Sequence, residues 1–502
     1  MPTAAYALEV DWTNTGTWVD ETANLLSVSI DRGFASPLAR MAKVGRGTFV
    51  LSNRTKAYSP ALQANVLPRR PVRFTMTVSA TPGVLFRGFT QSIKPTAGAW
   101  DARTVTLECV DAIALLDMHE GPIALGLNYR ADELIRDVVA AVYTPPATAY
   151  DKGVSVFPVT ADKWSFGEWS GFDLAVRQEQ GARASRKIQD ACASDWGRFY
   201  VGKSGSPAYA NRHNIVLNST TAFTVADDCV TLNYEKNIED VFNVVDVTVT
   251  PRSLGTTLEV LGRVDRPIKL EASASQLVTI RFTDPATRAA LGGYGMLAPV
   301  AGTDYTATSD EAGEGTAVTG SVSAAMTAYS DRADITLTNG SASVVYVRGP
   351  AGGLQVRGYA VRARQAVTAT AQSAGSITAY QKRRLAVSAP LSDSESYAQR
   401  LADYLLGFSA APPDKVRGVT LWANRDTASL AYARDAELLH RVVVTEAQTG
   451  LSSYAGYVFG LKHTITGMAE HTLTLDLETA PSVGTPFQLG VSLMGGTDVM
   501  VF

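Results

Sequence analysis

The chain has 502 residues and a formal net charge of −3, with 46% hydrophobic and 19% charged residues. This length predicts two to four domains, and the composition predicts folded domains with a lightly charged surface. The lysines and arginines are scattered, so we expect no sequence-specific binding of nucleic acid. No window approaches the roughly 20 apolar residues of a membrane-spanning helix. No secretory signal pattern opens the chain, which favours synthesis in the cytoplasm.

Residues 1–112 predict an amino-terminal β-barrel. Glycine, proline and asparagine divide this region into short segments, and apolar residues alternate with polar ones inside each segment. Such alternation places every second side chain in a β interior. The residues expected there are Val28, Ile30, Phe49, Leu51, Val72, Phe74, Phe86 and Phe89.

Residues 113–230 predict an α+β domain. The segment 131–143 has apolar residues on one helical face, acidic residues in its first turn, and Pro145 and Pro146 after its end. A second helix is expected over 184–194, and a β-hairpin with a polar turn at 202–206 follows it.

The rest of the chain predicts mostly strands. Residues 231–252 are expected to return to a barrel, and 253–385 to form an inserted β-rich domain. A helix within 386–415 is expected to pack on the α+β domain, with Ser392 and Glu395 as a capping box and Gly407 at its end. Residues 416–502 predict a carboxyl-terminal β domain and a tail. We find no repeat of fixed period.

Candidates for metal binding are weak. His463 and His471 flank a predicted hairpin and could approach one another, but two strand histidines are more often hydrogen-bonded than ligating. Asp304, Asp310 and two nearby glutamates form an acidic patch without the ordered spacing of a calcium loop. The three cysteines, Cys109, Cys192 and Cys229, lie far apart and suit buried thiols in a reducing compartment.

Candidates for catalysis are equally weak. No nucleophile elbow is present, and the glycines at 292–295 lack the spacing of a phosphate cradle. Residues 164–179 mix aromatic and acidic side chains and leave open a sugar-binding cleft or a cell-wall hydrolase. They are Trp164, Glu168, Trp169, Phe172, Asp173 and Glu179. We assign no catalytic, cofactor-binding or metal-binding residue and expect no enzyme and no cofactor.

The order of short motifs in the first ninety residues resembles the amino-terminal barrel of bacteriophage tail hub and minor tail proteins. The matching segments are Val-Asp-Trp at 10–12, the Asn-x-Gly-x-Trp turn at 14–18, and the segments 26–33, 47–53, 58–60, 67–68, 71–72 and 85–88. Arg69 and Arg70 stand where the family usually has glycine. Looser matches continue to the carboxyl end and are weakest over 255–330.

This resemblance implies a mainly β, multi-domain structural protein of the virion, made in the host cytoplasm and placed at the tail tip. It implies a homotrimeric baseplate hub that joins the distal tail protein ring to the tip and lines the channel for genome ejection. The implied partners are the distal tail ring, the tape measure protein, and tail fibre or receptor-binding proteins. Two alternatives remain open: a tail-tip protein that binds host glycans, and a tail-associated cell-wall hydrolase.

Overall fold

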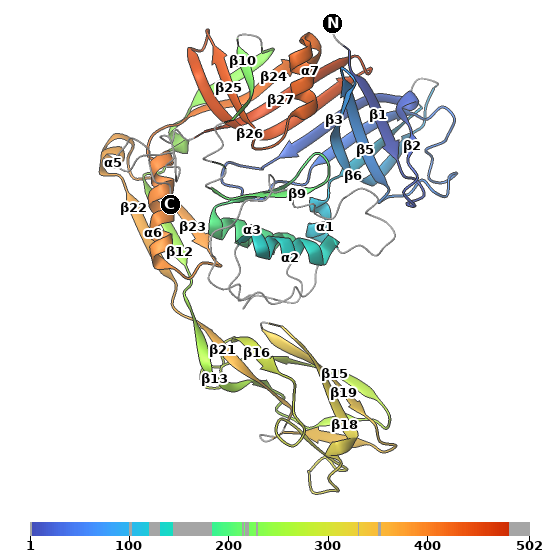
Figure 1. Ribbon diagram of the computed structural model, residues 1–502, viewed down its shortest axis with the longest axis vertical. Helices are drawn as coiled ribbons and strands as arrows, with labels where there is room; N and C mark the ends of the chain where they lie inside the picture. Colours follow the sequence, from blue (N-terminus) through green and yellow to red (C-terminus); the bar gives the residue numbers. More distant parts are fainter. Residues whose placement is uncertain are drawn as a thin grey trace, which may run out of the picture.

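The computed structural model describes residues 3–99, 103–119, 131–143, 183–212, 215, 220–226, 229–329, 331–349 and 353–480. Two β modules lie next to each other, a helical region lies beside them, and an inserted domain projects away on two strands (Figure 1). The mainly β, multi-domain fold is therefore confirmed. Within the described residues, no helix combines the length and apolar character needed to cross a membrane.

The amino module contains the first seven strands. They are β1 (Ala5–Val10), β2 (Val19–Asp20), β3 (Leu25–Gly33), β4 (Arg46–Ser52), β5 (Pro71–Val78), β6 (Thr81–Thr96) and β7 (Thr104–Val110). Each residue that the alternation assigned to the interior is buried, from Val28 to Phe89. Burying one such aliphatic or aromatic side chain contributes about 1.5–3 kcal/mol, so this alternation is the main stabilising pattern of the module.

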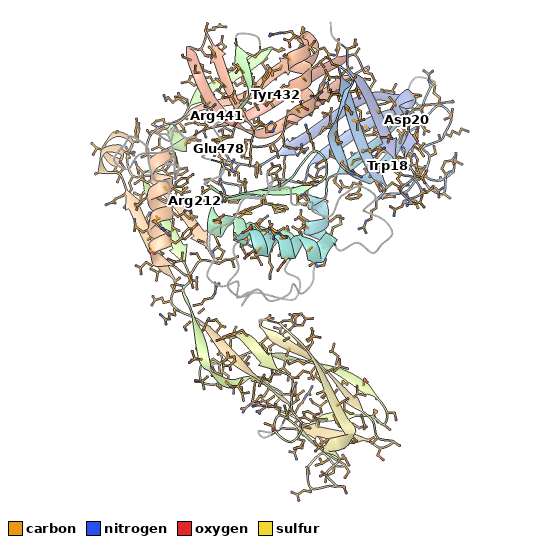
Figure 2. All side chains as sticks on the ribbon, viewed as in Figure 1. Trp18, Asp20, Arg212, Tyr432, Arg441 and Glu478 are labelled. Atoms are coloured by element: carbon orange, nitrogen blue, oxygen red, sulfur yellow. The ribbon has the colours of Figure 1, made fainter. Side chains whose placement is uncertain are left out.

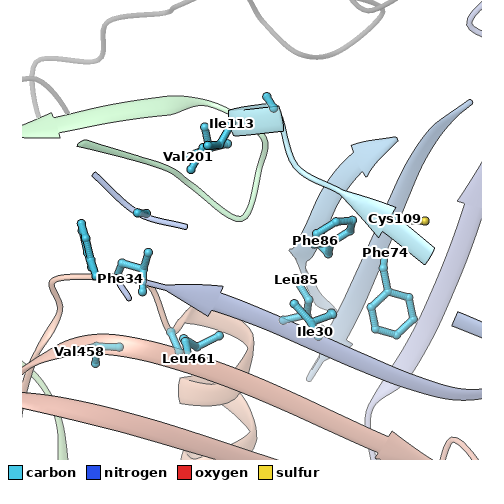
Figure 3. Packing of buried hydrophobic residues seen from close by; sticks show 14 of the residues in the cluster. Ile30, Phe34, Phe74, Leu85, Phe86, Cys109, Ile113, Val201, Val458 and Leu461 are labelled. Carbon is cyan, nitrogen blue, oxygen red and sulfur yellow. The ribbon is translucent and has the colours of Figure 1, made fainter. Parts of the chain in front are cut away.

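The carboxyl module is built from segments far apart in the sequence. It contains β10 (Thr221–Ala226), β11 (Thr231–Lys236), β24 (Asp414–Trp422), α7 (Thr427–Asp435), β25 (Arg441–Glu446), β26 (Leu451–Thr466) and β27 (Glu470–Thr479). Strand β26 pairs antiparallel with β3, so both modules share one 13-stranded sheet. The hydrophobic core is continuous across this pairing, as Figure 3 shows for Ile30, Val458 and Leu461.

The helical region contains α1 (Ile113–Met118), α2 (Ala131–Tyr143), α3 (Ala184–Asp195) and the hairpin β8 (Arg198–Val201) and β9 (Pro207–Ala210). The predicted helix over 131–143 is confirmed with these bounds. Helix α3 ends because Trp196 adopts a left-handed conformation, with φ of 58°. Cys192 and Ile188 on its inner face join the core of the two modules.

A smaller α/β unit holds the base of the inserted domain. Its strands are β12 (Val244–Val249), β22 (Val367–Gln372) and β23 (Arg384–Ala389), and its helices are α5 (Ala374–Tyr380) and α6 (Glu395–Ser409). Residues 231–252, expected to return to a barrel as one piece, are thus divided: β11 lies in the large sheet and β12 lies here. The division follows from burial, because β12 packs its valines under α6 in a separate core.

The end positions of helix α6 differ from the sequence prediction. Ser394, rather than Ser392, is the N-cap, and its hydroxyl accepts a hydrogen bond from the Tyr397 N–H at 3.2 Å. The helix continues past Gly407 to Ser409, whose hydroxyl donates to the carbonyl of Leu405 at 2.9 Å. The helix also reaches α3, since Tyr397 donates to the Ser194 carbonyl at 2.5 Å.

The inserted domain has its own hydrophobic core. Its strands are β13 (Arg252–Arg263), β14 (Ile268–Leu270), β15 (Ser275–Arg281), β16 (Gly292–Leu297), β17 (Thr306–Thr308), β18 (Val322–Ala328), β19 (Arg332–Asn339), β20 (Val345–Arg348) and β21 (Gln355–Ala363). Strands β13 and β21 pair along their lengths and connect the domain to the α/β unit. A separate core on a two-stranded connection is typical of a domain that folds independently.

Candidate functional site

The two histidines singled out in the sequence do meet, but inside the core. His463 Nδ1 lies 2.9 Å from His471 Nε2, and His471 Nδ1 lies 3.0 Å from the Tyr6 hydroxyl. Burial lowers the pKa of His471 to about 4 and also lowers the pKa of His463 well below its usual value. The ring nitrogens therefore join β1, β26 and β27 by a chain of hydrogen bonds. Among the described residues, no group of three or more histidine, cysteine or acidic side chains is arranged to hold a metal ion.

The other candidate residues make contacts within the fold. Asp304 is buried and accepts two hydrogen bonds from Arg357, at 2.6 and 3.0 Å, whereas Asp310 caps the Gly313 N–H at 2.6 Å. The glycines at 292–295 lie in strand β16, and 202–206 form the β8–β9 turn. The aromatic and acidic cluster from Trp164 to Glu179 lies outside the described residues.

The motif residues of the amino module form one polar cluster that fixes two loops. The Asp11 carboxylate accepts from the Gly16 N–H at 2.5 Å and shapes the 13–16 turn. Glu21 accepts from Trp12 Nε1 at 2.7 Å and from the Tyr58 hydroxyl, which itself accepts from Asn24 at 2.6 Å. The Asp-Trp and Tyr-Ser-Pro motifs are therefore two sides of the same buried contact.

This cluster gives a stability prediction. We expect Glu21→Ala to lower the free energy of unfolding by about 2–3 kcal/mol, because Trp12 and Tyr58 keep buried donors without an acceptor. Urea unfolding followed by tryptophan fluorescence measures the loss. Glu9→Ala, which removes a half-exposed ion pair with Arg73, is the matched control and should cost about 1 kcal/mol or less. Equal losses in the two variants would contradict the assigned role of Glu21.

The two β modules repeat one arrangement. The strand order is β3-β4-β7-β6-β5-β1 in the amino module and β11-β24-β27-β26-β25-β10 in the carboxyl module. The strands also follow one another along the chain in the same order. The modules differ at one position: β1 is antiparallel to β5, whereas β10 is parallel to β25.

The sequence carries a trace of this repeat. Strands β6 and β26 both have 16 residues, and each has a bulge where its pairing with β7 or β27 shifts, at 90–92 and at 458–460. Aligned on these bulges, Thr-Val-Thr-Leu-Glu at 104–108 matches Thr-Leu-Thr-Leu-Asp at 472–476. The segment Ser-Val-Ser-Ile-Asp-Arg at 27–32 likewise matches Thr-Leu-Asn-Tyr-Glu-Lys at 231–236. The repeat has no fixed period and was not predicted from the sequence.

The outer face of the shared sheet is rich in hydroxyl groups. One row of directly paired residues crosses both modules: Trp422, Thr472, Thr464, Ser29, Thr48, Glu108 and Ser92. Two lysines at this face have acidic neighbours: Lys94 lies 2.5 Å from Glu108, and Lys43 lies 2.8 Å from Asp31. The result is a polar surface that runs across the module junction.

Below this face, buried ion pairs hold the junction together. Arg32 on β3 donates to the Val201 carbonyl at 2.8 Å and to Glu437 at 2.7 Å, and Glu437 also accepts from the Lys203 N–H at 2.8 Å. Burial is the largest single effect and raises the pKa of Glu437. The charges of Arg32 and Lys203 and the hydrogen bonds from the Lys203 and Leu438 N–H groups together outweigh it, so the pKa is lowered. A second ion pair joins Arg198 of β8 to Glu478 of β27, and Figure 2 labels Glu478.

Comparisons with solved structures identify the fold. The tail protein from Neisseria meningitidis MC58 matches with a TM-score of 0.50 at 10% identity, covering 95% of this chain and 96% of that chain. The 43 kDa tail protein of prophage MuSo2 from Shewanella oneidensis gives a TM-score of 0.49 at 9% identity, covering 95% and 99%. No family model and no curated protein matches the sequence. By its likeness to the first of these structures, the chain has the fold of that tail protein.

Proposed function

We propose that this protein is a structural subunit of a phage-type tail, in which three copies form the hub ring at the tail tip. The observation that carries this proposal is the repeated β module within a chain that has a tail-protein fold. Three copies of a chain with two equivalent modules present six similar units around one axis. Such a ring can meet a sixfold ring on one side and a threefold tip on the other.

The hydroxyl-rich face fits the wall of the channel. DNA is held by proteins mainly through lysine and arginine contacts to phosphates, so a wall for passage should have few unpaired cations. On this face Lys94 and Lys43 both have acidic neighbours, and threonine and serine make up most of the row of paired residues. The proposed role is scaffold geometry without catalysis, within the virion.

The mass of the purified protein in solution tests this function. We expect a species of three times 53.4 kDa in mass photometry, and a threefold ring with a central opening in negative-stain images. In particles, antibody labelling should place the protein at the tail tip. A protein that stays monomeric at high concentration and never enters particles would overturn the proposal. Binding to a host glycan array by a monomer would instead favour the receptor-binding alternative.

A further inference from the structure

The repeat gives each module an equivalent place for a strand-to-strand contact, but only one of these two contacts is formed within the chain. Within the chain, the second half of β26 pairs with β27 on one side and with β3 on the other. The equivalent half of β6, residues 91–96, pairs with β7, and no described strand lies on its other side. Strand β11, the equivalent of β3, likewise pairs with β24 and with no other described strand. In the described residues, each module therefore has an open edge at the position where the other module forms the β3–β26 contact.

The repeat also sets which residues correspond at these edges. Counting from the matching bulges, Lys94 on β6 occupies the position of Lys462 on β26. Glu235 on β11 occupies the position of Asp31 on β3, because Glu235 lies opposite Lys415 just as Asp31 lies opposite Arg46. Within the chain, Asp31 lies directly opposite Lys462. The open edges thus carry the same acid and base that face each other at the closed contact.

We propose that β11 of one copy pairs antiparallel with residues 91–96 of β6 in the next copy, in the register that β3 and β26 use within the chain. This inference rests on the proposed ring and names the surfaces that close it. The register places Glu235 opposite Lys94, Tyr234 opposite Pro95, and Asn233 opposite Thr96. Since one copy's carboxyl module meets the next copy's amino module, the contact is heterologous and generates a ring when it closes.

The side chains at the β11 edge support a buried contact. Val230 is 47% exposed, Ile238 50% and Trp422, on the neighbouring strand β24, 57%. An open strand edge flanked by large apolar side chains is a surface to which another strand adds by main-chain hydrogen bonds. Pro95 supplies no N–H group, so it can take part in this ladder only through its carbonyl.

A second copy is the occupant that the structure favours. The complementary edge is present on the same chain, with the opposite charge at the matching position. Lys94 is 60% and Glu235 42% exposed at the side chain, and their neighbours Glu108 and Arg417 lie on the paired strands of their own modules. The side chains of Lys94 and Glu235 are therefore both accessible to a second copy of the chain.

Charge reversal tests the pairing in the full-length protein. We expect Glu235→Lys and Lys94→Glu each to weaken trimer formation at least tenfold, because like charges then oppose each other across the strands. The double variant should recover the trimer, which a merely structural role for either residue would not produce. Lys269→Glu and Glu271→Lys alter an exposed pair at 2.7 Å in the inserted domain and should leave the trimer unchanged. Circular dichroism checks that each variant folds.

A cysteine pair tests the register directly. Residues directly opposed in antiparallel strands have Cα atoms about 4.5–5.5 Å apart, within the range that a disulfide spans. In a Cys229→Ser background, we expect Asn233→Cys with Thr96→Cys to form disulfide-linked oligomers on oxidation, and Asn233→Cys alone to form none. A wild-type trimer that resists charge reversal and does not cross-link would overturn this pairing and leave the proposed ring standing. A wild-type monomer absent from particles would overturn both.

Discussion

Replacing Arg32 with alanine is expected to lower the free energy of unfolding by about 3–5 kcal/mol. Arg32 and Glu437 lie on different modules, and their side chains are only 2% and 11% exposed. Without the guanidinium, the Glu437 carboxylate keeps the Lys203 N–H as a partner but loses the charge that lowers its pKa. The variant must therefore bury an uncompensated charge or take up a proton, and both weaken the junction of the modules.

Urea unfolding followed by tryptophan fluorescence measures this loss at the junction. No tryptophan lies in the sequence of the inserted domain, and the four in the described residues, Trp12, Trp18, Trp196 and Trp422, report on the modules and the helical region. Lys43→Ala is the control, because its ion pair with Asp31 is 42% and 48% exposed and should contribute about 1 kcal/mol or less. Arg32→Met combined with Glu437→Gln should recover part of the loss, since no buried charge then remains. A loss below about 1 kcal/mol in Arg32→Ala would show that the pair does not hold the junction.

Individual strands and helices could be predicted because the residues that determine each of them are close together in the sequence. Alternation along the first strands identified a core that includes Ile30, Phe49 and Phe74, all fully buried. The apolar face and first-turn acids of 131–143 identified α2. Helix α7 was missed because its alanines give a weak apolar face. Its usable signal was Asp426, whose carboxylate accepts the Ser429 N–H at 2.7 Å as an N-cap.

The junction could not be predicted, because its contacts join distant parts of the chain. Arg32 forms an ion pair with Glu437, but nothing in the sequence around either residue indicates a buried partner of opposite charge. The internal repeat was hidden for a related reason. The inserted domain and the α/β unit lie between β11 and β24, so no fixed period exists. The matching segments are also short and keep residue character more than identity, as Ser27 and Thr231 illustrate.

Acid is expected to destabilise the junction through the buried histidines. Burial lowers the pKa of His471 from its usual value of 6.5 to about 4 in the folded state. Between these values the unfolded chain binds more protons than the folded chain, so stability is lost as the pH falls through this window. The shift corresponds to about 3 kcal/mol for His471 by pH 4. His463 shifts in the same direction, and Tyr6 completes the hydrogen-bonded chain.

His471→Gln isolates this effect. Asp111, whose pKa burial raises to about 7, acts in the opposite direction, because its protonated form is favoured in the folded state. It titrates in both proteins and cancels in their difference. We expect wild type to lose about 3 kcal/mol relative to His471→Gln between pH 6.5 and pH 4, measured as urea unfolding at several pH values. A pH-independent difference between wild type and His471→Gln would mean that His471 does not carry the acid sensitivity of the junction.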